Sequence, residues 1–180
     1  MSDNAPKVSV IIPVYNTGYY LRETLNSICT QTLEEQEIIL LNDGSTDGSM
    51  KIIEEYATKD SRIQYHTQPN QGLSVARNQA MKHATGKYMY FMDSDDLLDR
   101  NALQQCYQTC EKDNLDFVFF DAEPILDSAR TENIPDYNRK EQIDENVWKG
   151  IDLLNYELDN QLFRTPVWLC FVNRQFLNKF

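Results

Sequence analysis

The stretch KVSVIIPVY, Lys7–Tyr15, is rich in β-branched residues and almost continuously apolar. A strand that is apolar on both sides is typical of the centre of a parallel sheet, where helices cover both faces. Residues 17–31 follow with apolar side chains at helical spacing, and the run EIILLND, residues 37–43, returns to a strand pattern. The stretch therefore predicts the first strand of a strand–helix–strand unit.

The same alternation continues as far as residue 122. In chain order the later segments are helix 46–60, strand 62–68, helix 72–85, strand 87–93, helix 100–113 and strand 115–122. Such alternation predicts an α/β fold with a mostly parallel central sheet, flanked by helices and joined by right-handed crossovers.

Beyond residue 122 the pattern changes. Residues 123–146 are polar, acidic and interrupted by two prolines, which predicts a long excursion or lid. A helix is expected over residues 150–163, and an aromatic-rich segment, residues 165–180, ends the sequence.

Composition narrows the range of functions. The chain has 180 residues, 41% of them hydrophobic, which suits one globular domain. With 28 acidic and 17 basic residues, the net charge is -11, the wrong sign for a nonspecific binder of nucleic acid or anionic lipid. A bound nucleotide would therefore need a cation as mediator.

Location is predicted from features that the sequence lacks. The four cysteines show no CxxC spacing, and MSDNAPK, residues 1–7, has no apolar core of a signal peptide. Both features indicate reduced thiols in a cytoplasm. No apolar run approaches the length of about 20 residues that spans a bilayer, while peripheral membrane attachment through regions outside this chain stays open.

Polar residues follow each predicted strand, at the sheet edge where ligands bind in open α/β folds. In NDGSTDGS, residues 42–49, one of Ser45, Thr46 or Asp47 is suited to cap the next helix. Capping leaves Asp43 unexplained, and its carboxylate is suited to accept from a pyrimidine N–H or a ribose hydroxyl. Neither GxxxxGK nor GxGxxG follows a strand, which argues against P-loop enzymes and nicotinamide dehydrogenases.

Four carboxylates crowd the segment DSDDLLD, residues 93–99. Asp96, Asp99 or Ser94 is suited to cap the helix that begins near residue 101, where the helix dipole favours negative charge. Asp93 and Asp95 should repel each other, which should raise the pKa of at least one and calls for a positive partner. Mg²⁺ or Mn²⁺ fits that arrangement, and simple loop acidity is the alternative.

With SVIIPVYN, LLNDGSTDGS, NQGLSVARN and GKYMYFMDSDD in this order, residues 7–121 resemble family 2 glycosyltransferases. The resemblance implies an inverting enzyme with a GT-A fold that uses a UDP-sugar donor, a divalent cation, and a saccharide or lipid-linked saccharide as acceptor. It also implies a nucleotide-sugar-binding half, residues 1–121, and the start of an acceptor-side region, residues 122–180.

The resemblance also implies roles for residues of the donor half. Pro13 and Tyr15 would line the base, with a core tyrosine as the alternative for Tyr15. Asp43 would recognise uracil. Arg77 would approach the base or the diphosphate, an ordinary surface helix residue being the alternative. The other two positions implied in the nucleotide site lie in the loop before Arg77, at Asn70 and Gly72.

Asp93, Ser94 and Asp95 match the DXD element that gives the family its metal site. The resemblance implies Asp95 as the direct metal ligand and Asp93 as the partner of the ribose or of metal-bound water. Ser94 would belong to the same donor-binding turn. The cation would bridge the phosphates and offset the charge of the leaving nucleotide.

The catalytic base is where the chain departs from the family. Members usually carry a downstream acidic residue after a segment like VWLCFVNRQFL, residues 167–177, whereas this sequence ends at Phe180. We therefore expect a fragment whose base lies beyond Phe180, with Glu157 and Asp159 as weak substitutes.

Two other functions stay open on the sequence alone. A nucleotidyltransferase should show a glycine-rich phosphate loop with Arg or Lys after the first strand, and PVYNTGYY, residues 13–20, has neither. A non-catalytic module that only binds a nucleotide sugar is the second alternative. The sequence does not specify the sugar, the acceptor or the oligomeric state.

Overall fold

The computed structural model describes residues 5–125, 147–160, 162 and 167–179. By their contacts, residues 1–118 and 170–180 form one compact unit, and residues 119–169 form the other. The functional division predicted between residues 121 and 122 stays a prediction. Most of the predicted excursion over residues 123–146 lies outside the described part of the chain.

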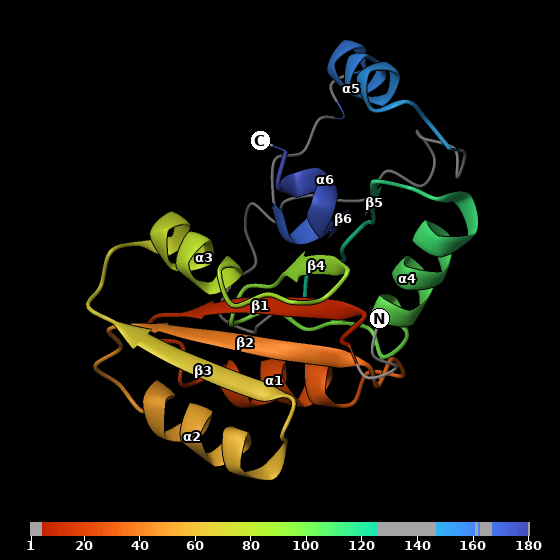
Figure 1. The fold of residues 1–180 in the computed structure, drawn as a ribbon. Coiled ribbons are helices and arrows are strands. Elements are labelled where there is room, and N and C mark those ends of the chain that lie inside the picture. Colours follow the sequence, from red (N-terminus) through yellow and green to blue (C-terminus); the bar gives the residue numbers. More distant parts are fainter. Residues whose placement is uncertain (1–4, 126–146, 161, 163–166, 180) are drawn as a thin grey trace. The chain divides into compact units, whose positions relative to one another are not determined.

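The elements follow the predicted alternation through the first unit (Figure 1). In chain order they are β1 (Val8–Val14), α1 (Leu21–Cys29), β2 (Gln36–Asp43), α2 (Ser49–Lys59), β3 (Ile63–Gln68), α3 (Leu73–Met81), β4 (Tyr88–Phe91), α4 (Ala102–Asp113), β5 (Phe117–Phe119), β6 (Cys170–Asn173) and α6 (Arg174–Leu177). β5 crosses the boundary between the units, and the second unit also contains α5 (Gly150–Asp159) and η1 (Val167–Leu169).

The described strands form one sheet in the order β3-β2-β1-β4-β6-β5. β1 pairs in parallel with β2 and β4, and β2 pairs in parallel with β3. Every residue of β1 and β2 is buried, as the apolar sequence of β1 predicts. The α/β fold with a mostly parallel central sheet is therefore confirmed.

Helices cover both faces of this sheet. Figure 1 shows α1 and α2 on one face and α3 on the opposite face. The helices change face where the order of the strands reverses. β2 and β3 lie on one side of β1, and β4 lies on its other side. Such a switch point opens a crevice at the carboxyl ends of the strands, here between β1 and β4.

Pro13 lies next to this switch point. Its backbone pairs in register with β2 at Leu41, while the pairing of β1 with β4 ends at Ile11 and Phe91. The carbonyl of Ile11 accepts from the backbone N–H of Met92, so the backbone of Ile11 faces β4. The backbone of Pro13, two residues further on, also faces the β4 side, but beyond the last paired residues. A proline is tolerated there because no ladder hydrogen bond is lost.

No strand was predicted in residues 165–180, yet β6 forms there and pairs antiparallel with β4. β5 is shorter than the predicted strand over residues 115–122. The helix predicted over residues 150–163 is observed as α5. Among the helices that the structure describes, none is long and apolar enough to cross a membrane.

Candidate functional site

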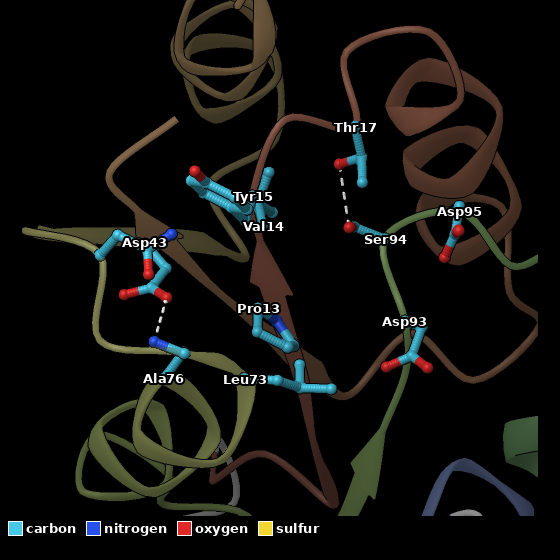
Figure 2. Close-up of a pocket in the computed structure, with 12 residues that line it drawn as sticks. Pro13, Val14, Tyr15, Thr17, Asp43, Leu73, Ala76, Asp93, Ser94 and Asp95 are labelled. Carbon is cyan, nitrogen blue, oxygen red and sulfur yellow. Dashed lines mark hydrogen bonds between the residues drawn. The ribbon is translucent and has the colours of Figure 1, made fainter. Parts of the chain in front are cut away.

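A cavity of about 260 Å³ lies within the first unit, at the carboxyl ends of the central strands (Figure 2). Of the nine site residues named from the sequence, eight line it: Pro13, Tyr15, Asp43, Asn70, Gly72, Asp93, Ser94 and Asp95. The ninth, Arg77, contacts the site through Asp93. Residues from four separate segments therefore meet at one place.

The end of β1 forms one wall of the cavity. Tyr15 is 49% exposed, so the alternative reading as a core tyrosine is wrong. In Figure 2 Pro13 and Tyr15 lie between Asp43 on one side and the Asp93–Asp95 segment on the other. An exposed aromatic ring beside carboxylates offers a flat apolar surface for a ligand ring.

Asp43 ends β2 and is only 3% exposed. Its Oδ1 accepts from Nε2 of Gln68 at 2.7 Å and from the backbone N–H of Gln71 at 2.9 Å, and its Oδ2 accepts from the backbone N–H of Gly72 at 2.9 Å. The prediction that Asp43 has no structural role is therefore wrong, because its carboxylate holds the loop that leads into α3. A carboxylate has about four acceptor positions, which leaves room for one more donor from the cavity.

Gly44 allows the loop before α3 to approach the end of β2 closely. Its φ of 75° is in the left-handed region, and a Cβ there would meet the backbone nitrogen of Asn70 at 2.8 Å. Gly48 is the N-cap of α2, and no side chain caps this helix, so the predicted cap by Ser45, Thr46 or Asp47 is wrong. Asp47 Oδ1 does accept from the backbone N–H of Ser49, the first residue of α2, at 2.9 Å. Its Oδ2 accepts from the backbone N–H of Gly18 at 2.9 Å, which ties the loop after β1 to the loop after β2.

Asp93 forms an ion pair with Arg77 of α3. Their side chains are 28% and 18% exposed respectively, so Arg77 is not an ordinary surface residue. A guanidinium thus supplies a positive partner to Asp93. Arg77 Nε is buried and has no hydrogen-bond partner among the described residues.

In the acidic segment, the carboxyl group of Asp96 has a raised pKa. Burial, followed by the negative charges of Asp93 and Asp95, raises the pKa of Asp96 to about 6. No side chain caps α4, whose N-cap is Asn101, so the predicted cap by Asp96, Asp99 or Ser94 is wrong. Asp99 Oδ1 accepts from the backbone N–H of Asn101 at 2.9 Å.

Ser94 lies between Asp93 and Asp95 and is only 5% exposed. Its hydroxyl oxygen accepts from Oγ1 of Thr17 at 2.9 Å, as Figure 2 shows, and its carbonyl accepts from Oγ1 of Thr24 at 3.0 Å. The contacts of Thr17 and Thr24 with this turn were not predicted from the sequence. Neither belongs to a motif, and only their contacts across the fold bring them to this turn.

The side chains of the cavity offer mainly oxygen atoms as ligands for a metal ion. Within the described ranges, no group of three or more His, Cys, Asp or Glu side chains is arranged to hold a metal ion. One or two carboxylates suffice for Mg²⁺ or Mn²⁺ when phosphate oxygens and water complete the shell. Glu157, which is buried, and Asp159, which is exposed, lie in α5 of the second unit.

Comparisons with known structures place the fold in a class. S. aureus TarS in complex with UDP-GlcNAc superimposes with a TM-score of 0.65 and 30% identity over 72% of this chain and 37% of that chain. The mannosyltransferase PcManGT from Pyrobaculum calidifontis, in complex with GDP-Man and Mn²⁺, gives 0.58 and 25% over 63% and 34%. The fold is therefore that of the GT-A glycosyltransferases.

The model of the family described as "Glycosyl transferase family 2" matches residues 9–168, which is most of the chain. The chain belongs to glycosyl transferase family 2. This result and the fold confirm the family and the fold class that the four motifs predicted.

Curated relatives agree with this assignment. The uncharacterized glycosyltransferase YibD of Escherichia coli is 34% identical over 181 residues, covering 99% of this chain and 52% of that protein. Glycosyltransferase GlyA of Streptococcus pneumoniae is 46% identical over 102 residues, covering 57% of this chain and 15% of that protein. The chain thus spans about half or less of these relatives' length.

Proposed function

We propose that this chain is the donor-binding part of an enzyme that binds a UDP-sugar and a divalent cation, Mn²⁺ or Mg²⁺, and transfers the sugar with inversion to a hydroxyl of a saccharide or lipid-linked saccharide. The observation that carries the proposal is the placement of Asp43 and the Asp93–Asp95 turn on opposite sides of one cavity, with the exposed ring of Tyr15 between them. The TarS complex, which contains UDP-GlcNAc, supports the choice of donor class.

At the base end of the cavity, Tyr15 would stack on uracil and Asp43 would accept its N3–H with the acceptor position that the loop contacts leave free. A guanine base presents a different pattern of donors and is larger. Asp43 is already fixed by three hydrogen bonds, so its orientation is set before the donor arrives. Pro13, Asn70 and Gly72 would complete the wall of this subsite.

At the phosphate end, Asp95 would supply the oxygen ligand to the cation, and Asp93 would contact the ribose or metal-bound water. When bound, the cation would neutralise the charge that develops on the departing diphosphate. Arg77 would hold the Asp93 carboxylate in place and bring positive charge to the same region. Ser94 would contribute through the conformation of the turn, since its hydroxyl is engaged by Thr17.

An inverting transfer also requires a base for the acceptor hydroxyl, which typically contributes about 10² to 10⁴ in rate. None of the carboxylates that line the cavity is proposed for this role, because Asp43, Asp93 and Asp95 serve the donor. The expectation that the base lies beyond Phe180 stays a prediction, as does the weak candidacy of Glu157 and Asp159. A module that binds donor without transfer would share every contact proposed here.

Calorimetry with UDP and with GDP, each with and without Mn²⁺, tests the donor assignment. UDP should bind more tightly than GDP, and its binding should depend on Mn²⁺. GDP is the informative competitor because PcManGT, with the same fold, was solved with GDP-Man. Equal or stronger binding of GDP would refute the proposed role of Asp43 and Tyr15.

The metal role of Asp95 is tested by a matched pair of variants. Asp95→Ala should weaken Mn²⁺-dependent UDP binding at least tenfold, which is about 1.4 kcal/mol. Asp99→Ala should have far less effect, because in the described structure the Asp99 carboxylate accepts a hydrogen bond from the local backbone N–H of Asn101. An equal loss in both variants would mean that the acidic segment acts as a diffuse charge and not as a metal site.

A further inference from the structure

Helix α1 and the turn that follows it direct a row of polar side chains toward the acidic loop, defined here as residues 93–101, which joins β4 to α4. The row consists of Thr24 and Ser27 of α1 and of Gln31, which lies two residues beyond the end of the helix. Their spacing of three and four residues places them on the same side. Thr24 is fully buried and Gln31 is 5% exposed. Apolar residues would be expected at such positions, so buried polar groups there require partners.

All their partners across this interface are main-chain atoms of the acidic loop or of the start of α4. Thr24 Oγ1 donates to the carbonyl of Ser94 at 3.0 Å, and Ser27 Oγ accepts from the backbone N–H of Leu98 at 3.2 Å. Gln31 uses both ends of its amide: Nε2 donates to the carbonyl of Asp99 at 2.7 Å, and Oε1 accepts from the backbone N–H of Leu103 at 3.2 Å.

These contacts define the path of the loop from one end to the other. Just beyond the row, the backbone N–H of Thr32 donates to the carbonyl of Arg100 at 3.0 Å. Because the bonded atoms belong to the main chain, the contacts fix the backbone without occupying the carboxylates. Thr24, Ser27 and Gln31 do not line the cavity, so they leave it free for a ligand.

We propose that Thr24, Ser27 and Gln31 are positioning residues that hold the acidic loop in its donor-binding conformation. A loop that carries Asp93, Asp95, Asp96 and Asp99 tends to open through repulsion between its carboxylates, which the contacts from this row oppose. Holding Ser94 fixes the orientation of the carboxylates on either side of it. Pre-organisation of this kind lowers the entropic cost of binding a cation and a diphosphate.

The restraint of the acidic loop by the row of polar side chains concerns the free protein alone, and hydrogen–deuterium exchange of the loop tests it. The gain in donor binding from this restraint rests on the proposed function, and calorimetry with UDP and Mn²⁺ tests it.

Thr24→Val keeps the shape of the side chain and removes the donor to Ser94. It should speed amide exchange across residues 94–103 and weaken Mn²⁺-dependent UDP binding by about 3- to 10-fold. Thr24→Ser keeps the hydroxyl and should restore both properties. Thr30→Val is the matched control, because Thr30 Oγ1 bonds only the carbonyl of Asn26 in the described structure.

Ser27→Ala is a second and milder variant, to be used if Thr24→Val does not fold. It removes the acceptor for the backbone N–H of Leu98 and should speed amide exchange there. Unchanged exchange in both variants would overturn the restraint. Faster exchange with unchanged affinity, or an equal loss of affinity in Thr24→Ser, would overturn the link to binding. If the unmodified chain binds no UDP, the proposed function fails while the exchange data still decide the restraint.

Discussion

Asp43 combines a structural and a proposed ligand-binding role in one side chain. Its carboxylate accepts three N–H groups, two of them from the main chain of the loop before α3. Asp43→Asn replaces an acceptor oxygen with an NH₂ group that faces other donors. The variant should lose about 1–3 kcal/mol of unfolding free energy and at least about tenfold in UDP affinity.

Urea unfolding and calorimetry measure these two effects of Asp43→Asn separately. Gln68→Met is the control, because it removes only the side-chain donor and leaves both backbone contacts to Asp43 in place. We expect small losses in this control. If Asp43→Asn lowered stability yet bound UDP normally, Asp43 would be a structural residue without a role at the base.

Most of the candidate site was predictable because strand ends of a parallel sheet converge. Tyr15, Asp43 and Asp93 each follow an apolar run, so the sequence alone indicates one common edge. The partners of these residues were not predictable. Thr17 and Thr24 lie 77 and 70 residues before the atoms of Ser94 that they bond, and no local pattern encodes that contact.

At the scale of elements, a buried carboxylate at the start of β2 joins three segments. Glu37 is 5% exposed, and its Oε1 accepts from Ser9 Oγ of β1 at 2.6 Å. The same oxygen accepts from the backbone N–H of Thr85 at 2.6 Å and of Gly86 at 3.0 Å. A Cβ on Gly86 would meet the backbone nitrogen of Ser9 at 2.6 Å, so the turn before β4 packs closely on β1.

Glu37→Gln keeps the size of the side chain but removes the charge that strengthens these hydrogen bonds. It should lower the unfolding free energy by about 1–3 kcal/mol. Glu35→Gln should change it by less than about 1 kcal/mol, because Glu35 forms an exposed ion pair with Lys7. Denaturant titrations at pH 7 compare the two, and equal losses would show that burial of Glu37 is not the cause.

The alternation of strands and helices was predictable through α4, because each element carries its own apolar periodicity. β6 was not. It is four residues long, and its antiparallel register with β4, in which Met89 faces Val172, depends on a contact between distant segments. A short aromatic-rich run gives no period from which strand and helix can be distinguished.

At the scale of the whole molecule, stability should depend on pH through His66 of β3, which lies beside the second histidine of the chain, His83 after α3. Their rings stack with centroids 3.6 Å apart. His66 Nε2 is buried without a hydrogen-bond partner in the described residues. Burial first, and the proximity of His83 second, hold the pKa of His66 below its ordinary value of 6.5.

The direction of the effect follows from proton binding. As the pH falls below about 7, the unfolded chain takes up a proton at position 66 before the folded chain does, so protonation favours unfolding. The contribution of His66 is therefore fully present above pH 6.5 and is lost as the pH falls through its depressed pKa in the folded state. His66→Gln cannot take up this proton.

Urea unfolding of the unmodified chain and of His66→Gln, from pH 7.5 to 5.0, measures the linkage. Carboxylates titrate in both proteins, so the difference between the two curves isolates His66. The unmodified chain should lose more stability than the variant over this range. His83→Gln removes the neighbouring charge but not the burial, and it should flatten the curve only in part. Parallel curves for the unmodified chain and His66→Gln would show that the stacked pair does not resist protonation.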